Sequence, residues 1–247
     1  MDLSVSRAVV TGGASGLGQA TARHFRERGA QVVLLDRDPA GARVARAMGA
    51  GFAETDVTDE DSVSRAIAAS VEAMGGIDIC VNCAGIVIGE KTLGREAPHS
   101  LAGFRRTVEI NLIGSFSVLR LAAAEMARNG RDENGVIVNT ASIAAFDGQK
   151  GQAAYAASKA GIAGMTLPIA RDLSSRNIRI CAIAPGIFAT PMLRGLPTEV
   201  QDGLAAGVTF PRRLGDPAEF ARMAGTIVEN AYLNGEVIRL DGGLRMT

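Results

Sequence analysis

The chain has 247 residues, 47% of them hydrophobic, and its 26 basic side chains are balanced by 26 acidic ones. A chain of this length buries roughly three quarters of its unfolded surface, so one substantial core is expected. The balanced charge excludes the basic footprint of a nucleic-acid binder and favours small-molecule partners. We find no signal peptide and no apolar stretch approaching the roughly 20 residues of a membrane span, and therefore expect a cytoplasmic protein.

Short apolar runs alternate with longer amphipathic segments along the chain. The runs that predict buried strands are RAVVTGG, AQVVLLD, IDICVNCAG, NGVIVNTAS, IRICAIAPG and GEVIRLDGG. Helices are predicted over residues 17–28, 39–48, 60–74, 103–129, 154–174 and 218–229. Parallel strands require such crossover connections, with helices on both faces of the sheet. The sequence therefore predicts a single α/β domain, residues 1–247, built on a doubly wound parallel sheet of the Rossmann type.

Helix caps and long connections refine this outline. Asp59 is expected to cap the helix that starts at Glu60, and Asp216 the helix that starts near Pro217. Residues 86–100 and 189–211 form connections longer than usual, and both follow the carboxyl ends of strands. Open α/β sheets bind ligands at that edge, so we predict substrate loops there, with ordinary surface insertions as the alternative.

The cysteines are predicted to be structural. Cys80 and Cys83 form a Cys-x-x-Cys, but it lies in an apolar strand-like run and does not open a helix as redox pairs normally do. Two scattered histidines supply no second pair of zinc ligands. We therefore expect buried, reduced thiols at Cys80, Cys83 and Cys181, and no metal site.

A glycine-rich turn, TGGASGLG, follows the first predicted strand and opens the first helix. Its glycines, Gly12, Gly16 and Gly18, permit a tight turn and a close approach of the backbone to a pyrophosphate at the helix N-terminus. Asp36 ends the second predicted strand, where a carboxylate binds the adenosine ribose hydroxyls and repels a 2′-phosphate. The pattern favours NAD, although Arg37 leaves NADP open.

Asp56 and Val57 follow a third strand of the expected sheet. They could bracket the adenine of a dinucleotide, or Asp56 could serve only as a turn residue.

A tyrosine and a lysine four residues apart share one face of the helix predicted over residues 154–174. A free phenol with a pKa of about 10 is a poor base near neutrality, but a cation beside it favours the phenolate. Lys159 supplies that cation for Tyr155, and Ser142 is a second hydroxyl that could hold a substrate oxygen. The arrangement predicts proton transfer from a secondary alcohol coupled to hydride transfer to a nicotinamide.

These motifs together resemble the short-chain dehydrogenase/reductase family over essentially the whole chain. The resemblance lies in TGGASGLG, NCAG (82–85), INLIG around Asn111, Ser142, YAASK (155–159) and APGIFATPM (184–192). It implies a catalytic tetrad of Asn111, Ser142, Tyr155 and Lys159. Tyr155 would be the acid/base, Lys159 would lower the pKa of Tyr155 and hold the nicotinamide ribose, and Ser142 would orient the substrate oxygen. Asn111 would hold a water that relays protons from Lys159.

Within the family, longer runs resemble the type II 3-hydroxyacyl-CoA dehydrogenases, also called 17β-hydroxysteroid dehydrogenase type 10; they include NTASIAAFDGQKGQAAYAASKAGIAGM and NGEVIRLDGGLRM. This subgroup implies NAD-dependent interconversion of L-3-hydroxyacyl-CoA and 3-ketoacyl-CoA, and a homotetramer. It places Gln152 beside the reacting oxygen. The cofactor contacts assigned by motif and resemblance are Gly12, Ser15, Gly16, Leu17, Gly18, Asp36, Asp56, Val57, Cys83, Ala84, Gly85, Tyr155, Lys159, Pro185, Gly186, Phe188 and Thr190.

Several alternatives remain open at this point. The loop 86–100 is shorter than in the subgroup and carries Lys91, Arg95 and His99 in a different arrangement, so chain-length preference is not fixed. The apolar segment 189–211 could also close over a steroid, cyclic or aryl secondary alcohol. Reduction of acyl carrier protein thioesters with NADPH is a third possibility. A moonlighting scaffold subunit, as among animal relatives, is an alternative of another class.

Overall fold

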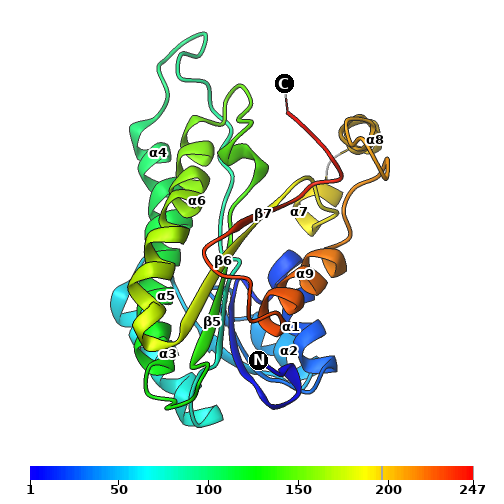
Figure 1. Cartoon of the computed structure of the whole chain (residues 1–247). Helices are drawn as coiled ribbons and strands as arrows, with labels where there is room; N and C mark the ends of the chain where they lie inside the picture. The colour runs from blue at the N-terminus through cyan, green and yellow to red at the C-terminus, as the bar shows by residue number, and fades with distance from the viewer. Residues whose placement is uncertain (196, 247) are drawn as a thin grey trace.

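The structure, a computed structural model, describes residues 1–195 and 197–246. In these residues seven parallel strands form one sheet in the order β3-β2-β1-β4-β5-β6-β7 (Figure 1). Every pairing is parallel. The strand order reverses between β1 and β4, and the crevice above such a point is where doubly wound sheets bind nucleotides. The strands are β1 (Arg7–Thr11), β2 (Gln31–Asp36), β3 (Gly51–Glu54), β4 (Ile79–Asn82), β5 (Gly135–Thr140), β6 (Ile178–Pro185) and β7 (Val237–Leu240).

Helices cover both faces of this sheet. Buried side chains form one core between the sheet and the layer of α1, α2 and α9, and another between the sheet and the layer of α3, α5 and α6. Strand β6, which lies between β5 and β7, is buried at every residue, as expected for a parallel strand covered on both faces. The helices are α1 (Gly16–Glu27), α2 (Gly41–Ala47), α3 (Glu60–Met74), α4 (Leu101–Val108), α5 (Gly114–Met126), α6 (Ala153–Leu173), α7 (Pro191–Arg194), α8 (Thr198–Ala206) and α9 (Pro217–Glu229).

The predicted fold is confirmed, with two additions. The apolar runs omit β3, whose sequence GFAE is short and lies at the edge of the sheet, although the position of Asp56 required a strand there. The segment 189–211 is not a plain loop, because it contains α7 and α8. Pro191 starts α7, and Val200 and Leu204 give α8 a helical spacing. Leu196, within this segment, lies outside the described residues.

Both predicted caps are present. The side chain of Asp59 accepts hydrogen bonds from the amides of Asp61 and Ser62 at the start of α3. Asp216 and Glu219 form a capping box at the start of α9, with Pro217 in the first turn. These caps fix where α3 and α9 begin relative to the sheet.

One helical segment is long and apolar enough to span a membrane, although we expected no such segment from the sequence. Leu101–Met126 is 26 residues long, and its most apolar window has a mean hydropathy of 1.3. In the structure 44% of that window is buried, and α5 packs on β4 and β5. A helix that packs against a sheet passes the same test, so this segment is weak evidence for a membrane span.

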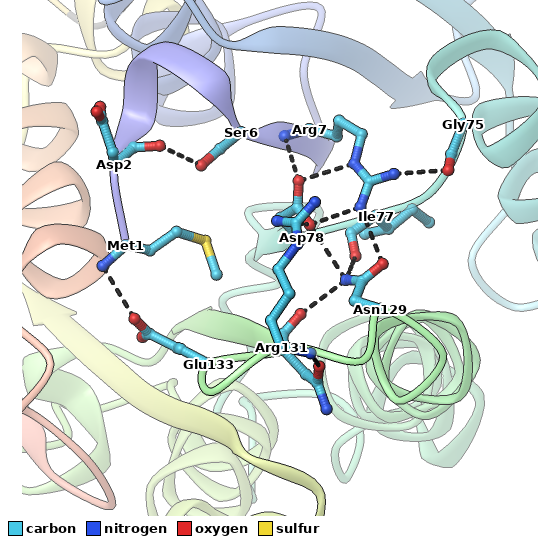
Figure 2. A network of polar contacts seen from close by, with 11 residues as sticks. Met1, Asp2, Ser6, Arg7, Gly75, Ile77, Asp78, Asn129, Arg131 and Glu133 are labelled. Atoms are coloured by element: carbon cyan, nitrogen blue, oxygen red, sulfur yellow. Dashed lines mark hydrogen bonds and ion pairs between the residues drawn. The ribbon is translucent and has the colours of Figure 1, made fainter.

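A polar network closes the amino-terminal edge of the sheet (Figure 2). Asp78 has no exposed surface, and its carboxylate accepts hydrogen bonds from the guanidinium groups of Arg7 and Arg131 and from the side chain of Asn129. Arg7 also bonds the carbonyl of Gly75. This network joins β1, the start of β4 and the segment after α5 at the edge of the sheet opposite to the predicted site.

Candidate active site

The glycine turn after β1 forms a cradle at the N-terminus of α1. Gly12 and Gly16 have φ angles of 61° and 53°, a conformation that favours glycine. A Cβ atom on Gly12 would lie 2.9 Å from the backbone nitrogen of Ala84, so the turn is in close contact with the segment that follows β4. Ser15 caps α1 without a side-chain hydrogen bond, which leaves the amides of the first turn available to an anion. The cradle fits a dinucleotide pyrophosphate.

Asp36 is tied to the same turn. Its Oδ2 atom accepts a hydrogen bond from the amide of Ala14 at 3.0 Å, and its Oδ1 atom accepts one from Asp38 at 3.1 Å. The carboxylate is therefore held at the end of β2, beside the turn.

Asp56 has a lowered pKa. The hydrogen bonds from Thr58 are the main cause, and the charge of the exposed Arg37 makes a smaller contribution. These bonds also make Asp56 a turn residue, and it lines the cleft as well.

A cleft of about 530 Å³ runs along the carboxyl edge of the sheet from Asp36 to Thr190. It lies over the reversal of strand order, where a dinucleotide is expected. The predicted cofactor residues that line it are Gly12, Ser15, Gly16, Leu17, Gly18, Asp36, Asp56, Val57, Cys83, Ala84, Gly85 and Thr190.

A second cavity of about 360 Å³ adjoins the first, and the two share Leu17, Cys83, Gly85, Ile86 and Thr190. It contains three of the four predicted catalytic residues as well as predicted contacts from the end of β6. Those lining residues are Ser142, Gln152, Tyr155, Lys159, Pro185, Gly186 and Phe188. A substrate in this cavity would lie directly beside the nicotinamide end of a dinucleotide in the cleft.

Asn111, the remaining tetrad residue, lines neither cavity. It lies in a five-residue π-helix, Glu109–Ile113, between α4 and α5, a distortion that is frequent at functional sites. Its Nδ2 donates to the carbonyl of Ile86 at 2.9 Å and to Ser158 Oγ at 3.1 Å, and its Oδ1 accepts from the amide of Ile86 at 2.8 Å. Asn111 therefore clamps the backbone after β4 to the face of α6 that carries the catalytic pair.

Lys159 is 5% exposed and is held by the sheet edge. Its Nζ atom donates to the carbonyl of Thr140, and burial lowers its pKa to about 8. The Thr140 hydroxyl donates to Cys83 Sγ at 3.4 Å. Burial raises the pKa of Cys83 to about 11, so the thiol stays protonated. Cys83 is only partly buried, which differs from the expectation for all three cysteines.

Tyr155 does not show the lowered pKa that we expected. Burial raises the pKa of its phenol, and a side-chain hydrogen bond with Ser142 lowers it by less. The Nζ atom of Lys159 is 5.9 Å from the ring centroid of Tyr155, and its direct partner is a backbone carbonyl. In this geometry Ser142, and not Lys159, is the group that lowers the pKa of the phenol against its burial.

Several lining residues were not singled out individually in the sequence, although Leu204 belongs to the segment 189–211 predicted as a substrate loop. Arg106, Glu109 and Ile110 reach the cleft from α4 and the π-helix, and Leu204 and Met246 reach the second cavity from α8 and the carboxyl-terminal segment. Their positions depend on how distant segments pack. Three basic residues of the two long connections, Lys91, Arg95 and Arg194, do not line the second cavity.

The loop 86–100 is ordered by contacts of its own. Glu90 accepts a hydrogen bond from the amide of Ser100 at 2.8 Å, and His99 packs edge-on against Phe104. No group of three or more His, Cys, Asp or Glu side chains in the described part of the chain is placed to hold a metal ion.

This sheet order, glycine cradle and Ser-Tyr-Lys pocket define a dehydrogenase with a nicotinamide cofactor, and the chain belongs to the short-chain dehydrogenase/reductase family. A family model described as Enoyl-(Acyl carrier protein) reductase matches residues 12–245. The chain is similar to 3-hydroxyacyl-CoA dehydrogenase type-2 of Homo sapiens, with 53% identity over 247 residues, 97% of this chain and 95% of that protein.

Two further relatives carry the same name. The chain is 52% identical over 246 residues to 3-hydroxyacyl-CoA dehydrogenase type-2 of Drosophila melanogaster, covering 96% of each chain. The crystal structure of 3-hydroxyacyl-CoA dehydrogenase type-2 from Mycobacterium avium superposes with a TM-score of 0.93 at 42% identity, over 97% of this chain and 96% of that one. The protein is thus an oxidoreductase that acts on a small molecule with a nicotinamide nucleotide.

Proposed function

We propose that the protein interconverts L-3-hydroxyacyl-CoA and 3-ketoacyl-CoA with NAD. The observation that carries this proposal is the pocket shared by Ser142, Tyr155 and Lys159 beside the cofactor cleft, in a chain 53% identical to a 3-hydroxyacyl-CoA dehydrogenase type-2. The apolar side chains of the pocket suit an acyl chain: Ile143, Ala144, Ile187, Leu193, Leu204 and Met246.

The chain's own residues account for the proton. In the oxidation direction, Tyr155 Oη accepts the proton of the substrate hydroxyl, and in reduction it returns that proton. Ser142 bonds the same oxygen, and its own Oγ is fixed by the amide of Ala144 at 3.1 Å. When bound, the oxidised nicotinamide supplies the hydride acceptor and a positive charge near the phenol. Lys159, whose ammonium donates to the carbonyl of Thr140, lines the same pocket, where the resemblance assigns it to the nicotinamide ribose.

NAD is proposed over NADP because of Asp36. Its carboxylate is held beside the glycine turn by the amides of Ala14 and Asp38, so it cannot readily move away from a 2′-phosphate. A phosphate there would meet like charge, whereas ribose hydroxyls would donate hydrogen bonds to the carboxylate.

Turnover of L-3-hydroxybutyryl-CoA with NAD tests the function, and the chain offers a matched control. Tyr155 and Tyr232 are its two tyrosines, and Tyr232 is fully exposed. Tyr155→Phe should lower kcat/KM by about 10²–10⁴-fold, as expected for loss of a general acid/base. Tyr232→Phe should leave it unchanged, and both variants should bind NADH, followed by its fluorescence. Full activity of Tyr155→Phe, or no thioester turnover by the unaltered protein, would contradict the proposal.

A homotetramer remains a further prediction of the resemblance, and the cytoplasmic location expected from the sequence also remains a prediction. Two exposed apolar side chains support assembly: Phe116 on α5 is 46% exposed, and Ile113 in the π-helix is 48% exposed. Sedimentation at several concentrations would measure the mass, and Phe116→Glu should shift it toward a smaller species.

A further inference from the structure

Arg239, on β7, joins two segments at the substrate pocket. The first is the loop 146–152, which leads into α6, and the second is the segment 241–246, which we name the carboxyl-terminal strap. Arg239 Nη2 donates to Asp147 Oδ2 and to the carbonyl of Leu244 at 2.6 and 3.0 Å, and its Nε donates to Asp241 Oδ2 at 2.7 Å. Its guanidinium also lies 5.5 Å from the ring centroid of Phe146. One side chain therefore contacts both segments, twice each.

The two carboxylates around position 239 favour a positively charged side chain there. Asp147 and Asp241 both direct a carboxylate at the guanidinium, and Arg239 lowers the pKa of Asp147. The Arg239 side chain is 22% exposed and that of Asp241 is 8% exposed. Without the guanidinium, the two carboxylates would repel each other across a partly buried gap. Arg245 would remain on Asp241 and adds a weaker charge near Asp147, but its hydrogen bonds and ion pair stay within the strap.

The strap is a wall of the pocket and also holds the segment that follows α8. Met246 lines the catalytic cavity. The amide of Phe210 donates to the carbonyl of Gly242 at 3.0 Å, and Thr209 Oγ1 donates to the carbonyl of Gly243 at 3.0 Å. These bonds hold the segment that follows α8, and Figure 1 shows the red end of the chain running from β7 toward α7 and α8.

The loop 146–152 forms another wall of the same cavity. Gln149 and Gln152 line it, and the amide of Gln149 donates to Gln152 Oε1 at 3.1 Å. Gln152 caps α6 one turn before Tyr155. Displacement of Asp147 would therefore change the pocket beside the reacting oxygen while leaving the cofactor cleft intact.

We infer that Arg239 is a positioning residue for substrate binding, which holds the loop 146–152 and the carboxyl-terminal strap together as the walls around the acyl chain. This inference rests on the proposed function, because it assigns the cavity to an acyl chain. Arg239 touches no reacting atom, and its loss should weaken substrate binding more than the chemical step.

The first test compares Arg239→Gln with Arg245→Gln, a control that removes an exposed partner of the same carboxylate. We measure kcat and KM for 3-hydroxyacyl-CoA substrates of short and long acyl chain, and KM for NAD. Arg239→Gln should raise KM for the long-chain substrate by about tenfold, with kcat within about twofold and KM for NAD unchanged. Arg245→Gln should match the unaltered protein. An equal loss of kcat for all substrates, with KM unchanged, would overturn the inference.

A second measurement does not depend on turnover. Hydrogen exchange of residues 146–152 and 241–246 should rise in Arg239→Gln and not in Arg245→Gln, while exchange of α1 stays constant. Unchanged exchange in both segments overturns the inference, whatever the substrate is. Absence of acyl-CoA turnover by the unaltered protein instead overturns the proposed function, and the acyl assignment with it. If Arg239→Gln does not fold, the isosteric Asp147→Asn provides the same comparison, since it removes the ion pair with Arg239 and weakens the hydrogen bond from the Met246 amide.

Discussion

The ammonium of Lys159 donates a 2.6 Å hydrogen bond to the carbonyl oxygen of Thr140, the last residue of β5. This bond fixes the catalytic helix α6 to the carboxyl edge of the sheet. The lysine is almost completely buried, and burial lowers its pKa to about 8. A buried ammonium is costly, so its presence indicates a position kept for function at the expense of stability.

We predict that Lys159→Met stabilises the folded protein at pH 7. Between about pH 8 and pH 10.5 the unfolded chain holds the Lys159 proton and the folded chain does not, so stability rises with pH in that window. The variant removes a penalty that is fully present below pH 8. We expect about 2 kcal/mol at pH 7, the lost hydrogen bond to Thr140 included, shrinking toward pH 10.5.

Urea unfolding at several pH values measures this difference, and Lys150→Met at an exposed position is the control. A stability difference for Lys159→Met that does not change between pH 7 and pH 10.5 would show that burial of the charge is not its origin.

Ser142 should set part of the pH dependence of turnover. Its hydrogen bond lowers the pKa of Tyr155 against the effect of burial, so Ser142→Ala should move the pH at which oxidation becomes fast to higher values. At pH 7 we expect kcat/KM to fall by about tenfold or more, because one substrate contact is lost as well. Ser142→Thr keeps a hydroxyl and is the control. An unshifted pH profile of kcat/KM for the alanine variant would contradict this role.

Asp36 should govern the choice of cofactor. Asp36→Asn keeps the shape of the side chain and an oxygen for the amide of Ala14, but removes the charge. The ratio of kcat/KM for NAD to that for NADP should therefore fall by about 10-fold or more. Asp38→Asn is the control, since Asp38 is exposed and does not line the cleft. Equal ratios in the two variants would mean that another group, such as Arg37, sets the preference.

The features predicted from the sequence are those that local patterns encode. The glycine turn, the apolar strands and the four-residue spacing of Tyr155 and Lys159 each depend on neighbouring residues and repeat period. The π-helix around Asn111 could not be predicted in this way, because INLIG has an ordinary helical composition. Its extra residue per turn depends on packing, and it lets Asn111 reach the backbone of Ile86.

Ion pairs between residues far apart in the sequence could not be predicted from sequence patterns either. Arg239 and Asp147 are 92 residues apart, and Arg7 and Asp78 are 71 residues apart. Charged residues at such separations meet only after the sheet has formed, and many others of the same type remain on the surface. The raised pKa of Tyr155 also depends on burial that spacing alone does not reveal.

The network around Asp78 should matter for stability and not for chemistry, because it lies at the opposite edge of the sheet from Tyr155 (Figure 2). Asp78→Ala leaves the largely buried guanidinium of Arg7 without its carboxylate, which should cost about 3–5 kcal/mol of unfolding free energy. Asp132→Ala, at an exposed neighbouring position, should cost almost nothing. Urea unfolding measures both, and kcat of the folded Asp78→Ala protein at low temperature should match that of the unaltered protein. A large fall in kcat without loss of stability would instead indicate that this edge is coupled to the active site.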